Sequence, residues 1–231
     1  LIADGHHRYE TALAYRDFRH RVAEEPVEDP PYDYVMALMV NMHDPGLQIF
    51  PTHRIVYGVE GFTAGELADE LAESDYFRTE WMDVNAREDA DAAVDQLEAA
   101  GEQLPSFALM ADQWEQPLLV EYVGDTDAPI FDEETGEQVR QLDTAILHEA
   151  ILDRMIGIDK EAQAEKRNLH YTRDLDEAVT AVEDPENQLV VLMNPTKIDQ
   201  VVDICQSGDK MPQKSTYFYP KILSGLTINP L

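Results

Sequence analysis

The sequence predicts an α/β or α+β fold, with a mixed sheet flanked by helices, and three observations support this. Several segments carry apolar residues at helical spacing, and short, continuous apolar runs typical of buried strands lie between them. From residue 169 onward, strand and helix patterns alternate, which favours a layered packing of sheet and helices. Of the 231 residues, 44% are hydrophobic, so a sizeable core is available.

The first elements surround a short polar motif. Helical spacing predicts a helix over 9–23, so the motif Asp4-Gly5-His6-His7-Arg8 lies at a helix N-terminus. The continuous apolar run 34–42 is typical of a buried strand, and a second strand is expected over 54–59.

The other elements follow in a regular order. Helices are predicted over 62–74, 86–100, 143–155, 175–182 and 197–206, and strands over 76–84, 107–111, 118–123, 169–172 and 188–193. The acidic stretch 125–138 is expected to be a surface loop, and 124–142 is the best candidate boundary if residues 1–231 form two interleaved lobes instead of one domain. Cys205 falls on an apolar helical pattern, which predicts a buried, inert thiol.

Acidic residues dominate the composition. Forty-seven Asp and Glu stand against 17 Lys and Arg, which gives a formal net charge of −30 and argues against a nucleic-acid partner. The acidity is spread along the chain, as in salt-adapted (halophilic) proteins. No apolar run reaches the roughly 20 residues that cross a bilayer and no signal-peptide pattern is present, so we expect a cytoplasmic protein with no membrane partner.

Three regions are depleted of acid. Residues 45–59 and 210–231 contain no Asp or Glu, and the predicted first helix is rich in His and Arg. In so acidic a protein, such regions are where an anion can bind without repulsion, and phosphate is the natural candidate. We therefore expect the three regions to converge on one cleft.

The expected phosphate ligands come from all three regions. A Gly-containing turn into a helix points backbone N–H groups and the positive end of the dipole at one place. The candidate ligands are Gly5, His6, Arg8, His53, Arg54, Lys214, Ser215, Thr216 and Lys221. Plainer alternatives are an N-cap turn at residues 4–8, a strand-start salt bridge at Arg54 and a terminal strand at 214–221, and His20, His148 and His170 are interpreted as surface or core histidines.

Familiar catalytic signatures are absent from the sequence. It has no HExxH and no paired CxxC, so no residues have the spacing of known metal ligands. It also has no P-loop and no GxGxxG, which excludes a classical kinase and a Rossmann enzyme.

Four segments carry a resemblance to a known family. They are residues 3–9 (Ala-Asp-Gly-His-His-Arg-Tyr), 40–54, Asn194-Pro195-Thr196, and 211–221 (Met-Pro-Gln-Lys-Ser-Thr-Tyr-Phe-Tyr-Pro-Lys). Across the whole chain the sequence resembles the bacterial and archaeal family called domain of unknown function 1015. Members of that family are longer, with the Asp-Gly-His-His-Arg motif mid-chain, so the resemblance implies that an upstream half is missing.

The same motif is also similar to that of ParB-like nucleotide-binding proteins, including kinases of free L-serine. This resemblance implies a ParB-like nucleotide-binding element at the N-terminal end, with His7 at the transferred phosphoryl group and Asp4 orienting the site. The donor would be ATP, ADP or pyrophosphate, with Mg²⁺ as cofactor and a general base upstream of the chain. Phosphoryl transfer needs positioning and positive charge, which His, Arg and Lys supply.

Three functions remain open at this stage. The first is a small-molecule phosphotransferase, best described as a serine kinase that makes O-phosphoserine. The second is a non-catalytic, ParB-like nucleotide-binding regulator, and the third is a structural or interaction domain. The absence of a strongly basic helix argues against DNA binding.

Overall fold

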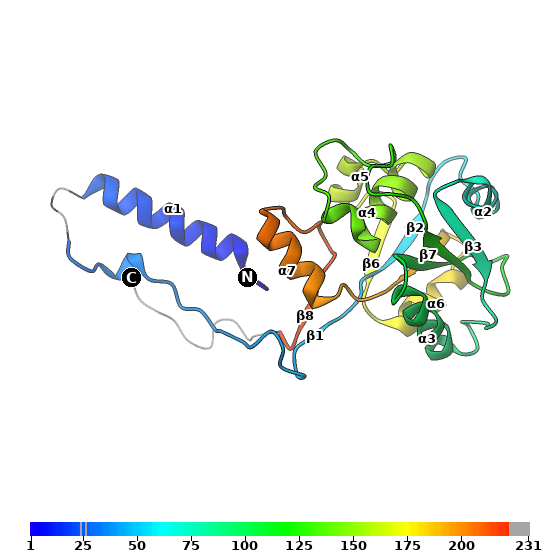
Figure 1. The fold of residues 1–231 in the computed structure, drawn as a ribbon, viewed down its shortest axis with the longest axis horizontal. Helices are drawn as coiled ribbons and strands as arrows, with labels where there is room; N and C mark the ends of the chain where they lie inside the picture. The colour runs from blue at the N-terminus through cyan, green and yellow to red at the C-terminus, as the bar shows by residue number, and fades with distance from the viewer. Residues whose placement is uncertain (24, 26, 222–231) are drawn as a thin grey trace. The chain divides into compact units, whose positions relative to one another are not determined.

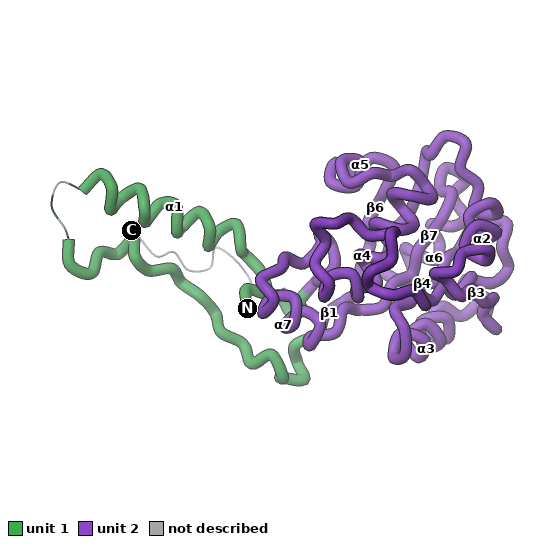
Figure 2. Tube along the Cα trace, turned by 45° about the horizontal axis from the view of Figure 1, so that its top comes forward, with its two compact units in different colours: residues 1–48, 218–231 green, residues 49–217 purple. Residues whose placement is uncertain are grey.

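The computed structural model describes residues 1–23, 25 and 27–221, and the chain divides into two compact units. Unit 1 comprises residues 1–48 and 218–231, and unit 2 comprises residues 49–217 (Figure 2). The segment 124–142 lies inside unit 2, and a boundary there stays a prediction. Residues 222–231 of the acid-free C-terminal stretch lie outside the described residues.

Unit 1 is built on the helix α1 (His6–Val22), which buries none of its residues. The helix is held to a single 3₁₀ turn, η1 (Pro31–Asp33), through side chains near its end. His20 Nε2 lies 2.5 Å from Asp33 Oδ1, and the Arg19 guanidinium stacks 4.8 Å from the ring centre of Tyr32. The predicted first helix is therefore confirmed, but it is a polar, exposed one.

The predicted strand over 34–42 is wrong. These residues take no regular secondary structure, and their apolar side chains are largely exposed, up to 92% at Met39. A continuous apolar run predicts burial only where another layer of the same chain covers it, and α1 offers no buried face.

Unit 2 contains a six-stranded sheet. Its strands are β2 (His53–Tyr57), β3 (Phe77–Trp81), β4 (Ser106–Met110), β5 (Leu118–Tyr122), β6 (Leu169–Thr172) and β7 (Asn187–Met193), in the order β3-β5-β4-β7-β2-β6. The α/β class is confirmed, but each pairing in this sheet is antiparallel, so the sheet is not mixed. Two short strands, β1 (Gln48–Ile49) and β8 (Phe218–Tyr219), make a second sheet where the chain passes between the units.

The topology explains why helix and strand alternate although no neighbouring strands are parallel. A helix connects β3 to β4, and these two strands run parallel to each other with β5 inserted between them. Another helix connects β6 to β7, which enclose β2 in the same manner. The sheet thus consists of two split β-α-β units joined through β4 and β7.

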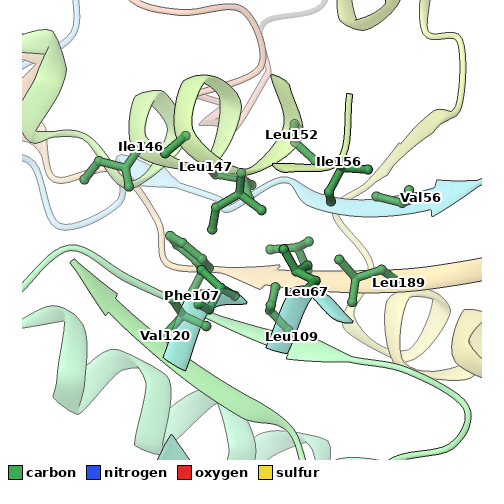
Figure 3. Packing of buried hydrophobic residues seen from close by; sticks show 14 of the residues in the cluster. Val56, Leu67, Phe107, Leu109, Val120, Ile146, Leu147, Leu152, Ile156 and Leu189 are labelled. Atoms are coloured by element: carbon green, nitrogen blue, oxygen red, sulfur yellow. The ribbon is translucent and has the colours of Figure 1, made fainter. Parts of the chain in front are cut away.

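Both faces of the sheet are buried. Phe107, Leu109 and Leu189 face one hydrophobic cluster, whereas Ala108 and Val190 face the other. The first cluster includes Leu147, Leu152 and Ile156, which point at the sheet in Figure 3. Burial on both faces is why these strands read as continuous apolar runs.

The helices lie on both faces (Figure 1). The first face is covered by α2 (Ala64–Glu73), α4 (Asp143–Ile146), the π-helix Leu147–Met155 and α5 (Lys160–Glu165). The second is covered by α3 (Ala90–Gly101), α6 (Leu175–Thr180) and the 3₁₀ turn Ala181–Glu183. The 3₁₀ turn Val139–Gln141 precedes α4. No helix in the described part of the chain is long and apolar enough to cross a membrane.

The last helix, α7 (Ile198–Ser207), corrects the prediction for Cys205. It buries Val201 and Ile204, and Cys205 is exposed as a free thiol. One residue advances about 100° around a helix, so Cys205 lies off the stripe that its neighbour Ile204 occupies.

Candidate functional site

The Asp-Gly-His-His-Arg motif forms the start of α1. Gly5 is the N-cap, in the left-handed conformation with φ +83°, and no side chain caps the first turn. His6 and His7 follow as the first two helical residues, with ring centres 4.0 Å apart. This leaves exposed imidazoles and first-turn N–H groups at one place, which is the geometry that suits an anion.

Asp4 joins the motif to the C-terminal acid-free stretch. Its Oδ2 lies 3.4 Å from an Arg8 nitrogen, and its Oδ1 lies 3.3 Å from Lys221 Nζ. The expected proximity of Lys221 to the Gly5 turn is therefore present within unit 1. His7 Nδ1 lies 3.5 Å from Glu10 Oε2 on the same helix.

In unit 2, strand β2 carries His53 into the interior. Its Nδ1 accepts a hydrogen bond of 3.1 Å from the Met193 backbone N–H. Burial, together with the neighbouring Arg54 charge, lowers the pKa of His53 to about 4. His53 is thus a neutral core histidine, and its link to β7 holds the sheet together.

Arg54 is 1% exposed, and no carboxylate in the described residues lies within ion-pairing distance of it. The guanidinium donates to the carbonyl oxygens of Thr52 and Lys214, the latter at 3.3 Å, while Nε has no hydrogen-bond partner among the described residues. Burial lowers the pKa of Arg54 to about 10, so the group stays charged. The strand-start salt bridge considered for Arg54 is not formed within the described structure.

His148 is the side chain that Arg54 reaches across the fold. An Arg54 terminal nitrogen lies 3.2 Å from His148 Nε2. Because a guanidinium can only donate, Nε2 must accept and Nδ1 carries the imidazole proton. Burial and the Arg54 charge keep the pKa of His148 well below its usual value, so the ring is neutral. The Arg54 guanidinium also lies 5.7 Å from the Tyr171 ring centre.

A pocket of about 390 Å³ adjoins this cluster. His148 and Tyr171 line it, together with Glu149, Lys160, Lys210 and Gln213. Glu149 already accepts hydrogen bonds from the Asp132 backbone and the Thr135 hydroxyl, at 2.9 and 2.7 Å, and it lies 3.6 Å from Lys160 Nζ. The buried positive charge of Arg54 lies behind the neutral side chains of His148 and Tyr171, which line the pocket. A pocket of this size beside such a charge suits a small anionic or polar ligand.

The remaining candidates lie beside Arg54 in the chain segment 212–216. Lys214 has φ +61° and an exposed side chain, and its carbonyl faces Arg54. The Ser215 hydroxyl is buried and donates to the Pro212 carbonyl at 2.7 Å, and the Ser215 carbonyl accepts from Thr196 Oγ1 at 2.7 Å. Thr216 is half-buried.

Two groups of predicted residues are therefore assembled, each within its own unit. Asp4, Arg8 and Lys221 meet at the start of α1, and Arg54 meets the backbone of Lys214. The single shared cleft stays a prediction, as does the ParB-like character of the N-terminal end.

The contact of His148 with Arg54 was not predicted, because the sequence pattern indicates only a surface or core histidine at this position. The available signal was its position on the apolar stripe of Ala145, Ile151 and Leu152, where a histidine needs a partner.

Mg²⁺ as a cofactor stays a prediction. No group of three or more His, Cys, Asp and Glu side chains within the described ranges could hold a metal ion. The ligand expected for Mg²⁺ is Asp4 or a carboxylate upstream of residue 1, and Asp4 lies within 3.4 Å of Arg8 and 3.3 Å of Lys221.

Solved structures similar to the chain include a free serine kinase in complex with AMP, at 14% identity and a TM-score of 0.43, of which the match covers 57%. They also include a conserved hypothetical protein from Pyrococcus furiosus, at 15% identity and a TM-score of 0.44, of which the match covers 60%. Each match covers 78% of this chain, and the chain thus spans less than two thirds of the length of these proteins. No curated protein matches the chain significantly.

A family model described as protein of unknown function (DUF1015) matches residues 1–145, which is more than half of the sequence. Together with the motifs at residues 3–9 and 40–54, which lie inside that match, this result shows that the chain belongs to the DUF1015 family.

Proposed function

We propose that this protein is a small-molecule phosphotransferase that phosphorylates free L-serine to O-phosphoserine, with ATP, ADP or pyrophosphate as donor. The observation that carries the proposal is the uncapped start of α1, where Arg8 and Lys221 approach Asp4 beside two adjacent histidines. Phosphoryl transfer needs donors and positive charge placed around the phosphate oxygens, and this cluster gathers both in a protein of net charge −30.

Each residue has a proposed role in that reaction. His7 contacts the transferred phosphoryl group, and Asp4 holds Arg8 and Lys221 in position. The N–H groups after Gly5 and the His6 imidazole bind phosphate oxygens.

Unit 2 contributes a second set of proposed phosphate-binding residues. Arg54 supplies a buried positive charge, His53 and Ser215 hold the strand and the loop around it, and Lys214 and Thr216 offer donors near it.

A second candidate function is nucleotide binding without transfer, as in a ParB-like regulator. The observation that favours it is that no residue described here is placed as a general base beside His7; Glu10, at 3.5 Å, is an exposed helix neighbour. Binding without turnover is what this candidate predicts.

Phosphorus NMR separates the two functions. The protein is incubated with L-serine and, in turn, ATP, ADP and pyrophosphate, with one set of samples containing EDTA; AMP, with which the serine kinase compared above was solved, serves as a binding probe. We expect a serine-dependent O-phosphoserine signal that falls about 10²-fold or more in His7→Ala, as for loss of one transition-state donor.

His20→Ala is the matched control, since His20 lies on the same helix and contacts Asp33 and the Tyr32 ring at its far end. It should retain turnover. Equal losses in both variants would assign the motif a structural role. Nucleotide binding without serine-dependent turnover would establish the regulator instead.

A further inference from the structure

A second pocket, of about 560 Å³, lies in unit 2 and has no part in the proposed phosphotransfer. It is formed where five parts of the fold meet: the end of α3, the loop before β4, the end of β5, the turn that leads into α4, and the start of α7. Its polar lining includes Glu98, Glu102, Arg140, Asp143, Asn194 and Lys197. The volume lies in the range of about 300–1,000 Å³ that small-molecule sites occupy.

Asp143 is the half-buried carboxylate of this pocket. Burial raises its pKa, and the Ser106 backbone and the Asn194 side chain act against that rise. Asn194 is itself held, because its Nδ2 lies 3.3 Å from the carbonyls of Leu97 and Ser106 and 3.2 Å from the Ser106 hydroxyl. The Asn194 amide, which lines the pocket together with Asp143, is therefore held in place before any ligand arrives.

The two cations of the pocket are already committed to backbone oxygens. The Arg140 guanidinium donates from all three nitrogens, to the carbonyls of Thr135, Thr126 and Asp132, at 2.8 to 3.0 Å. Lys197 Nζ donates to the Gly101 carbonyl at 2.9 Å. An anionic ligand would have to compete with these bonds.

The acidic groups are left to face the ligand. Glu98 and Glu102 are exposed at the rim, and neither forms an ion pair with any described residue. With Asp143 inside and a net charge of −30 around it, the field in the pocket favours a cation.

We propose that this pocket is a binding site for a small molecule bearing a primary ammonium group, which donates to the Asp143 carboxylate while its polar remainder meets the amides of the wall. The site is separate from the Arg54 cluster, although the segment 139–149 lines both pockets. A ligand in one pocket therefore contacts a chain segment that also lines the other pocket.

The affinity of this site for an ammonium ligand should increase with pH, because the Asp143 carboxylate must be ionised. Burial raises the pKa of Asp143 to about 7, against the opposing effect of Lys197. The other charges that face this segment are Arg54 from β2, Arg140 before α4, and Glu98 and Glu102 from the end of α3. An ammonium ligand binds the ionised carboxylate, so its affinity increases about tenfold from pH 6 to pH 8.

The test is calorimetric titration of the protein with ethanolamine, whose ammonium group stays protonated over this range. Ethylene glycol is the neutral probe of similar size, and glycolate is the anionic one. We expect ethanolamine to bind at least about tenfold more tightly than either, as for a charged hydrogen bond against a neutral one. Asp143→Asn should remove both this preference and the pH dependence.

Glu102→Gln, at the exposed rim, is the matched control and should keep the pH dependence. Lys197→Met, which keeps Asp143 intact, removes a charge that lowers the pKa of Asp143, so the increase in ethanolamine affinity should move to higher pH. This variant tests the site even where Asp143→Asn does not fold. Equal affinity for ethanolamine and ethylene glycol, tighter binding of glycolate, or unchanged binding in Asp143→Asn would each overturn the proposal. None of these outcomes bears on serine-dependent turnover.

Discussion

Arg54 takes a full positive charge into the interior of unit 2, while two histidines near it are held neutral. A buried charge costs several kcal/mol unless it is paired and hydrogen-bonded. Here carbonyl oxygens, a neutral imidazole and an aromatic ring take the place of a carboxylate among the described residues. The positive charge of Arg54 is therefore only partly compensated, and its electrostatic potential extends into the neighbouring pocket.

The buried histidines make stability dependent on pH. His53 titrates near 4 when folded and near its usual 6.5 when unfolded, so between these values the unfolded chain binds more protons. The free energy of unfolding should thus be highest above pH 6.5 and should fall by up to about 1.4 kcal/mol per pH unit towards pH 4. His148 acts in the same direction, and Asp143, whose pKa is raised to about 7, in the opposite one.

Urea denaturation at several pH values measures this effect. His53→Gln keeps an acceptor for the Met193 N–H but cannot titrate, so its stability should fall less steeply between pH 6.5 and 4. His43→Gln, at an exposed position, should follow the unsubstituted protein. Parallel curves for all three proteins would show that His53 does not titrate as described.

At the scale of elements, prediction succeeded where burial is decided locally. The strand predicted over 169–172 has those bounds, although only one of its faces packs on the core: Leu169 is buried and His170 is exposed. The strand predicted over 188–193 begins one residue earlier, at Asn187, and both of its faces are covered. The run 34–42 carries the same signal, but no layer of the described chain covers it, and the local sequence does not indicate which layers exist.

The candidate site was only partly predictable for a related reason. The absence of Asp and Glu from residues 45–59 indicated Arg54 as a candidate ligand of an anion. Its partners His148 and Tyr171 lie about a hundred residues away in sequence and contact it only in the folded chain. The second pocket depends on five separate parts of the fold, and no local pattern indicates it.

The end of α3 allows a sharp test of close packing. A Cβ on Gly101 would lie 2.2 Å from Asn194 Nδ2, whereas one on Gly65 in α2 meets nothing within 4 Å. We expect Gly101→Ala to destabilise the protein by about 1–3 kcal/mol through overpacking. Gly65→Ala should stabilise it by up to about 1 kcal/mol, because alanine favours the helix. Denaturant midpoints of the two variants check this, and equal shifts would contradict the contact.

For the whole molecule, the net charge of −30 opposes the compact state. The Debye screening length falls from about 10 Å at 0.1 M salt to about 3 Å at 1 M, which weakens the repulsion between the acidic groups. The melting temperature should therefore rise with KCl. The variant Asp69→Asn/Glu70→Gln/Glu73→Gln removes three exposed acids from α2, two of them near its negative end. This variant should have a higher melting temperature than the unsubstituted protein at low salt, and its melting temperature should rise less when KCl is added. A salt-independent melting curve would refute this account of the charge.

The two split β-α-β units also differ in when their strands become available. β3, β4 and β5 are close in sequence, so their half of the sheet can form early from short loops. β2 is synthesised before all of them, yet its partners β6 and β7 follow more than a hundred residues later. A ribosome-bound chain therefore carries β2, with His53 and Arg54, unpaired in the sheet until β6 has emerged, and its other edge stays unpaired until β7 has emerged. The Arg54 cluster is thus among the last features of unit 2 to be completed.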